Sequence, residues 1–129
     1  MLVLDASAVI EVLLRTTRAA KIEERIFKKA TSLSAPHLLD LEVLQVLRRY
    51  SGREMSEDRC HLAIIDFQDL PITRYPHHLF VHRIWELRKS MTAYDAAYVA
   101  LAEALEAPLL TCDTKLASAH GHTARILLV

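Results

Sequence analysis

Short apolar runs alternate with longer segments of helical periodicity along the chain. An unbroken apolar run between turn residues predicts a buried strand, and apolar residues three or four apart predict a helix. The predicted strands cover residues 2–4, 33–36, 71–73, 108–111 and 126–129. The predicted helices cover residues 7–15, 18–29, 38–50, 77–89, 93–106 and 114–119, with a further helix that begins at Ser56.

This alternation of strands and helices predicts an α/β fold. Strands that are apolar throughout are typical of a parallel sheet covered by helices on both faces. The length of 129 residues suits one domain with one core. We therefore expect a single three-layer α/β/α domain over residues 1–129, with a central, mainly parallel sheet of four to five strands. In such sheets, ligand sites form beyond the carboxyl ends of the strands.

The composition narrows the classes of function. Lys plus Arg and Asp plus Glu both number 16, so the formal net charge is zero. This balance argues against a strongly basic nucleic-acid binder but is compatible with a local basic groove. With only two glycines, the chain has neither a P-loop nor a dinucleotide-binding G-x-G-x-x-G motif. No apolar run approaches the roughly 20 residues that span a bilayer, so we expect no membrane insertion.

Two features favour a cytoplasmic protein. Cys60 and Cys112 lie far apart in the sequence and lack a zinc-binding spacing, so we expect both to stay reduced. The N-terminal segment carries Asp5 and Glu11 and has no basic region before its apolar residues, unlike a secretory signal.

Two predicted strands end in an aspartate. Asp5 follows the apolar run at residues 2–4, and Asp113 follows a later run. Asp is a favoured helix N-cap that contributes about 1 kcal/mol, so each acid could simply begin the next helix. Thr92 and Asp95 likewise fit a capping box. Capping explains each acid taken singly, whereas a metal site would explain why two of them follow buried strands.

The predicted helix at residues 38–50 carries two acids that capping does not explain. Glu42 and Asp40 lie at opposite borders of its apolar arc, whereas Arg48 and Arg49 lie on the opposite side or flank. A border acid early in a helix that follows a strand can point toward the carboxyl edge of the sheet. The helical phase leaves both acids as candidates.

Three segments, in this order, resemble the PIN-domain ribonucleases of the VapC toxin family: VLDASAVIEVLL, APHLLDLEVLQVLRR and MTAYDAAYVALAEALEAPLLTCD. The resemblance covers the chain end to end. It implies an endoribonuclease that hydrolyses RNA phosphodiester bonds with Mg²⁺ or Mn²⁺ as cofactor. The acids to which it assigns catalysis and metal binding are Asp5, Glu42, Asp95 and Asp113, and the hydroxyl residues that it places in support are Ser7 and Thr111.

The same resemblance implies partners and a substrate. It implies that the chain is the toxin of a toxin–antitoxin pair, with a VapB-type antitoxin, a homodimer, and a tRNA or a ribosomal RNA loop as target. Some family members carry a further acid just after the last aspartate, and the residues TKLA at 114–117 supply none.

Charge repulsion independently favours a cation at such a cluster. Two carboxylates ~4 Å apart repel by about 4 kcal/mol at an effective dielectric near 20, and a divalent cation reverses the sign of this energy. Mg²⁺ and Mn²⁺ prefer oxygen ligands. Among the basic residues, Lys115 and Arg15 lie near the predicted carboxyl edge and are candidates for a phosphate contact.

Two other functions are compatible with parts of the pattern. One is a catalytically inactive PIN-like module that only binds RNA or a partner. The other is a receiver-type phosphoacceptor domain, which also begins with an acid after its first strand. A receiver domain needs a phosphorylatable aspartate at the end of a central strand, and the segment 71–76 contains no aspartate.

Overall fold

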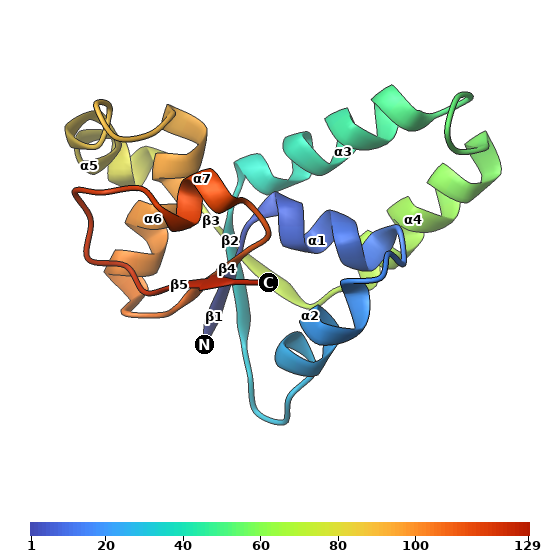
Figure 1. Cartoon of the computed structure of the whole chain (residues 1–129), viewed down its shortest axis with the longest axis horizontal. Helices are drawn as coiled ribbons and strands as arrows, with labels where there is room; N and C mark the ends of the chain where they lie inside the picture. The colour runs from blue at the N-terminus through green and yellow to red at the C-terminus, as the bar shows by residue number, and fades with distance from the viewer.

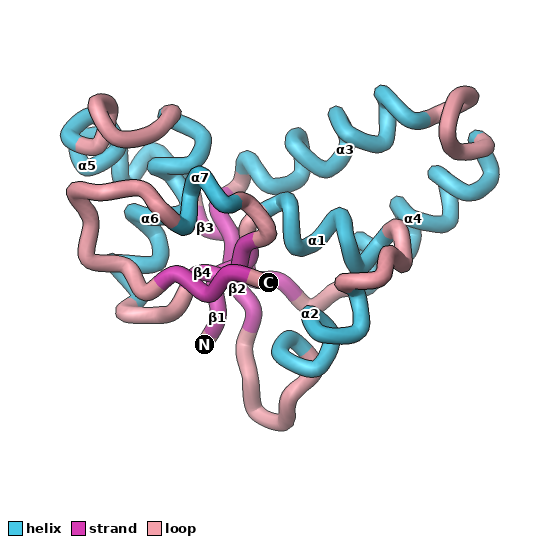
Figure 2. Tube along the Cα trace, in the orientation of Figure 1, coloured by secondary structure: helices cyan, strands magenta, loops and turns pink.

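The computed structural model describes residues 1–129 and contains a five-stranded sheet in which all neighbouring strands are parallel. Figure 2 shows the strands gathered at the centre with helices on both sides. The predicted three-layer α/β/α fold is therefore confirmed. The strands are β1 (Leu2–Leu4), β2 (Leu33–Pro36), β3 (Ile72–Tyr75), β4 (Leu109–Thr111) and β5 (Ile126–Leu128).

The helices match the sequence pattern closely, apart from one segment. In place of one helix over 77–89, a 3₁₀ turn leads into a short α-helix, and the buried Leu87 shares its N–H between two preceding carbonyls as that helix ends. The helices are α1 (Ala6–Leu13), α2 (Ala19–Ile26), α3 (Leu38–Tyr50), α4 (Glu57–Asp69), η1 (His77–Phe80), α5 (Val81–Glu86), α6 (Ala93–Leu105) and α7 (Thr114–Ala117).

The strand order is β3-β2-β1-β4-β5, so β1 is the central strand. All residues of β1, β2 and β4 are buried, whereas the edge strands β3 and β5 are partly exposed. Helices on both faces explain why the residues of the central strands are mostly apolar. In Figure 1, α1 to α4 lie on one side of the sheet and α5 to α7 on the other.

This order places a switch point between β1 and β4. The chain leaves β1 through α1 on one face, and it leaves β4 through α7 on the other. Ligands bind in the crevice that forms where neighbouring strands diverge in this way. Receiver-type domains have the order 2-1-3-4-5 instead, so the observed topology contradicts the receiver-type alternative.

The most deeply buried helix is α6. Every residue from Ala96 to Ala102 is buried, and the helix packs against β1 and β2. A helix that is apolar all round belongs in the core. Its first turn, which carries Asp95, reaches the edge of the sheet where β1 and β4 end. The core therefore fixes the direction in which this acid is presented.

The helices α3 and α4 form an antiparallel hairpin that projects away from the sheet in Figure 1. The turn between them contains Gly52 at φ +73°, a left-handed conformation that glycine adopts readily. Ser56 then caps α4 by accepting a hydrogen bond from the Arg59 N–H at 3.1 Å, as its place in the sequence predicted. The α3 part of this hairpin forms one wall of a groove at the edge of the sheet.

A hydrogen-bonded carboxylate holds the C-terminal loop against α6. Glu103 accepts two hydrogen bonds from the Arg83 guanidinium, both at 2.9 Å, and two from the N–H and hydroxyl of Thr123, both at 3.0 Å. Chiefly because of the Arg83 hydrogen bonds, the pKa of Glu103 is lowered to about 2. The contact joins α5, α6 and the segment that leads into β5.

Replacing Glu103 by Gln should lower the free energy of unfolding by about 2 kcal/mol at pH 7, because a neutral amide replaces the carboxylate that accepts the hydrogen bonds from Arg83. A lowered pKa means that this stabilisation is present above the ordinary pKa of 4.5 and is lost as the pH falls toward 2. Urea unfolding of both proteins between pH 7 and pH 3 should show the difference shrinking. Glu24→Gln, an exposed change on α2, should show no such difference at any pH.

Candidate active site

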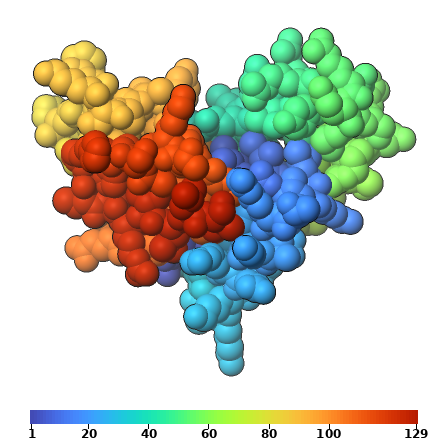
Figure 3. Space-filling model, viewed as in Figure 1, coloured from blue at the N-terminus to red at the C-terminus, as the bar shows by residue number.

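A groove of about 850 Å³ opens at the carboxyl edge of the sheet, between α1, α3 and the start of α6. Figure 3 shows the surface indented between the α3–α4 hairpin and the lobe of α5, α6 and α7. Four carboxylates from four separate segments line this groove. They are Asp5, Glu42, Asp95 and Asp113, the four acids that the sequence singled out.

Asp5 follows β1 directly and occupies the N-cap position of α1, but its side chain does not cap that helix. Instead, its Oδ2 accepts hydrogen bonds from the Ser7 hydroxyl at 2.6 Å and from the Thr111 hydroxyl at 2.7 Å. The residue is only 6% exposed. Capping is therefore the wrong interpretation of Asp5, because its carboxylate is turned toward the end of β4.

The two hydroxyls belong to a chain of hydrogen bonds that joins α1 to the end of β4. The Cys112 N–H donates to Ser7 Oγ at 2.9 Å, and the Asp113 N–H donates to Thr111 Oγ1 at 3.0 Å. Each hydroxyl thus accepts from the backbone after β4 and donates to Asp5. This arrangement holds the Asp5 carboxylate in one orientation and leaves its Oδ1 without a side-chain hydrogen bond.

Glu42 lies on α3 and is held from the opposite wall of the groove. The hydroxyl of Tyr98, a fully buried residue of α6, donates to Glu42 Oε1 at 2.7 Å. No motif in the sequence singles out Tyr98. The available signal is its place three residues after Asp95, which puts both on one face of α6.

Asp40 turns away from the groove. Its carboxylate accepts from the Arg74 guanidinium at 2.7 Å, and the two side chains form a half-exposed ion pair on the other flank of α3. The two border acids of α3 therefore point in different directions: Asp40 toward β3, and Glu42 toward α6.

Helix capping explains the position of Asp113 but not that of the Asp95 carboxylate. Thr92 caps α6 by accepting from the Asp95 N–H at 3.1 Å, but no hydrogen bond returns from the Asp95 carboxylate to the backbone of Thr92. That carboxylate faces the groove instead. Asp113 does cap α7, since its Oδ1 accepts from the Lys115 N–H at 2.9 Å. Asp113 therefore combines an N-cap with a position in the groove.

Burial and mutual repulsion disfavour the charged forms of three of these acids. Burial is the largest cause that raises the pKa of Asp5, and the Asp113 charge adds to it. Burial also raises the pKa of Glu42, with contributions from the charges of Asp5 and Asp95. The pKa of Asp95 is raised by burial and then by Asp5 and Asp113. The carboxylates thus lie close enough to repel one another, and a cation among them would relieve that repulsion.

The donor chemistry of the groove fits Mg²⁺ or Mn²⁺, both of which prefer carboxylate oxygens. No three His, Cys, Asp or Glu side chains, in this groove or elsewhere, already converge on a point that could hold an ion. Mg²⁺ is usually held by only one or two carboxylates and keeps several of its waters, so such convergence is not required. The Oδ1 atom of Asp5, which has no side-chain hydrogen bond, and the Asp95 carboxylate are suitable ligands for such an ion.

Arg48 and Arg49 line the same groove at the far end of α3. The sequence pattern had placed both on the side or flank of the helix opposite its apolar arc, and this flank forms part of the groove wall. Arg15, which the sequence suggested for a phosphate contact, lines a different hollow and pairs with Asp66 at 3.8 Å. The groove therefore has a negative end at the sheet and a positive end on the hairpin.

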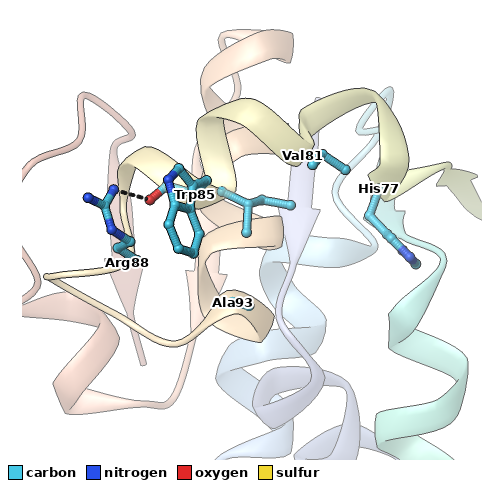
Figure 4. A pocket seen from close by; sticks show the side chains of 6 residues that line it. His77, Val81, Trp85, Arg88 and Ala93 are labelled. Atoms are coloured by element: carbon cyan, nitrogen blue, oxygen red, sulfur yellow. Dashed lines mark hydrogen bonds between the residues drawn. The ribbon is translucent and has the colours of Figure 1, made fainter.

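A second hollow, of about 370 Å³, lies between α5 and the start of α6. Figure 4 shows Trp85 and Val81 on α5 with Ala93 below them, and Arg88 beside the Trp85 ring, 4.5 Å from its centroid. No carboxylate lines this hollow. Its chemistry therefore differs from that of the acidic groove.

Two further expectations bear on the setting of the site. Cys60 and Cys112 are both free thiols, as their spacing predicted. None of the helices combines the length and the apolar character that crossing a membrane requires.

The sequence is similar to those of known ribonucleases. The PIN domain family matches residues 2–121. Ribonuclease VapC12 of Mycobacterium tuberculosis is 42% identical over 130 residues, which cover 100% of this chain and 99% of the relative. Ribonuclease VapC1 of the same organism is 43% identical over 129 residues, covering 98% and 96%.

Solved structures share the fold at low sequence identity. VapBC2 from Rickettsia felis, bound to a DNA fragment from its promoter, superposes with a TM-score of 0.71 at 11% identity and covers 97% of both chains. The sarcin–ricin loop cleaving toxin VapC20 of Mycobacterium tuberculosis gives a TM-score of 0.70 at 12% identity, with 92% and 94% covered. With a family match over nearly the whole chain and relatives above 40% identity, this chain belongs to the VapC family of PIN-domain ribonucleases.

Proposed function

We propose that this chain is the toxin of a toxin–antitoxin pair and cuts RNA internally with Mg²⁺ or Mn²⁺ bound in the acidic groove. The observation that carries the proposal is the meeting of Asp5, Glu42, Asp95 and Asp113, from four segments, in one groove at the switch point of the sheet. A bound divalent ion would supply positive charge for the scissile phosphate and a more acidic water.

In this proposal, the residues of the chain position the reaction. Ser7 and Thr111 fix one oxygen of Asp5, so the other is presented to the ion. Asp95, at the first turn of the rigid helix α6, and Asp113, at the start of α7, line the same groove and would offer further carboxylate oxygens to an ion. A divalent ion held among these four carboxylates would offset the negative charge of the RNA backbone.

The positive end of the groove suggests how RNA is bound. Arg48 and Arg49 line it, and arginine binds phosphate oxygens through two parallel hydrogen bonds. We propose that they contact the RNA backbone beside the cut. An unpaired loop of a tRNA or a ribosomal RNA suits an open groove, because its backbone and bases are accessible. The related VapC20 is described as cleaving the sarcin–ricin loop.

We further propose a VapB-type antitoxin as partner, in a cytoplasmic setting, and a homodimeric toxin. The family membership and the solved VapBC2 complex support the partner. Leu41 and Leu44 line the groove and are 73% and 42% exposed. Exposed apolar side chains of this kind favour contact with an apolar segment of a partner protein. Co-purification with the product of the neighbouring small gene tests this assignment.

Incubation of the purified protein with total RNA should give discrete internal cuts in Mg²⁺ or Mn²⁺ and none in excess chelator. Sequencing of the new RNA ends checks both the activity and the cut sites. Restored cleavage when Mn²⁺ is added back in excess over the chelator separates metal dependence from damage to the protein. An intact RNA population under every metal condition would favour the catalytically inactive module over the enzyme.

A further inference from the structure

We propose that Tyr98 is a positioning residue that holds Glu42 in its working orientation in the groove. The inference rests on the proposed function, because the orientation of Glu42 matters to the reaction only if the groove binds the metal. Tyr98 acts through Glu42 and is not itself placed against the substrate.

The contact between the two side chains is built into the core. Tyr98 is 0% exposed, and its hydroxyl donates to Glu42 Oε1 at 2.7 Å, its only hydrogen bond to another side chain. A buried tyrosine hydroxyl needs such a partner. The burial of the phenol and its single side-chain partner therefore direct this hydroxyl to Glu42.

The donor sits on a rigid support. Tyr98 lies in the fully buried run of α6 between Ala96 and Ala102, three residues after Asp95. Residues three apart share one face of a helix. One turn of α6 therefore presents the Asp95 carboxylate to the groove and also fixes the carboxylate of a different helix.

Glu42 needs this restraint more than the other acids do. It lies on the projecting hairpin, beside the exposed Leu41, and a glutamate side chain has three rotatable bonds. No other side chain donates to it. The hydroxyl binds Oε1 and leaves Oε2 of this groove-lining residue without a side-chain partner. Without Tyr98, Glu42 is free to turn toward solvent.

The test is Tyr98→Phe, which removes the hydroxyl and keeps the buried ring. The first measurement is the rise in melting temperature as Mn²⁺ is added without RNA, because an ion that binds only the folded state raises it. Loss of a partner that orients a ligand typically weakens metal binding by about 10–100-fold. We therefore expect the Mn²⁺ midpoint to rise at least tenfold, and the Mn²⁺ dependence of RNA cleavage to shift with it.

Two controls separate positioning from packing. Tyr50→Phe makes the same chemical change on α3, at a hydroxyl that has no hydrogen bond, and should leave the Mn²⁺ midpoint unchanged. In a Glu42→Gln background, Tyr98→Phe should have no further effect on the Mn²⁺ midpoint, since the group that it positions has lost its charge. This double-mutant cycle isolates the coupling between the two side chains.

The outcomes are distinguishable. An unchanged midpoint in Tyr98→Phe, with a normal Mn²⁺ response and cleavage in the wild type, overturns the inference and leaves the proposed function intact. An effect of equal size in the Glu42→Gln background also overturns it, because Tyr98 then acts through packing. A wild type that neither responds to Mn²⁺ nor cuts RNA overturns the proposed function and the inference together.

Discussion

Asp5→Asn is expected to reduce RNA cleavage by roughly a thousandfold or more at saturating Mn²⁺. The change removes the charge of the most buried acid in the groove at nearly constant volume. Metal-ion stabilisation of the transition state is worth several kcal/mol, and each 1.36 kcal/mol corresponds to about tenfold in rate. Single-turnover cleavage of one mapped RNA substrate measures the loss. Asp69→Asn, the same change at an exposed site on α4, is the matched control and should cut normally.

The same variant should be more stable than the wild type when metal is absent. Burial and Asp113 raise the pKa of Asp5, so its ionised form costs stability at neutral pH. Ser7 and Thr111 can still donate to an amide oxygen at residue 5. We expect a melting temperature a few degrees higher in chelator. This advantage should fade as the pH falls through the raised pKa, because the wild-type carboxyl is then also neutral.

The two readouts for Asp5→Asn separate catalysis from a structural role. A variant that melts lower in chelator and still cuts RNA at the wild-type rate would show that Asp5 serves the fold. A variant that melts higher, does not cut, and has a smaller Mn²⁺ response supports the metal assignment.

Glu42→Gln should lower RNA cleavage strongly and Asp40→Asn should leave it nearly unchanged, although the two acids are only two residues apart on α3. Glu42 lines the groove and accepts from Tyr98, so Gln at this position should lower cleavage by roughly a hundredfold or more, in line with about 3 kcal/mol of lost electrostatic stabilisation. Asp40 pairs with Arg74 outside the groove, so Asn there should leave cleavage within about twofold.

Asp40→Asn should affect the stability of the fold more than it affects cleavage, and this effect should itself be small. Breaking its half-exposed pair with Arg74 should cost at most about 1 kcal/mol, measured by urea unfolding. If Asp40→Asn silences the enzyme while Glu42→Gln cuts normally, the assignment of the acid on α3 is wrong. Each change keeps the length of its side chain, so the two variants differ from the wild type mainly in charge. Both should be compared with the same RNA and the same Mn²⁺ concentration.

The architecture follows from local signals in the sequence. The apolar runs of the three inner strands gave β1, β2 and β4 nearly residue for residue, because strands covered on both faces carry mostly apolar residues. Ser56 and Thr92 mark helix starts through capping, which needs only neighbours three residues away. The segment 77–89 departed from the prediction because the chain must turn at Leu87 to enter α6, and periodicity does not report such a turn.

The sequence by itself determined that acids follow β1 and β4, and that α3 and α6 each carry an acid near the start of the helix. Only the tertiary structure decided what these acids contact. One of the two hydroxyls that donate to Asp5 belongs to Thr111, 106 residues away, and the donor to Glu42, Tyr98, is 56 residues away. Helical phase states which face of α3 is buried, but not which neighbour meets its border. A buried or half-buried carboxylate needs a hydrogen-bond donor within reach. The orientation of α3 against α6 and β3 therefore decides that Glu42 contacts Tyr98 in the groove and that Asp40 contacts Arg74 outside it.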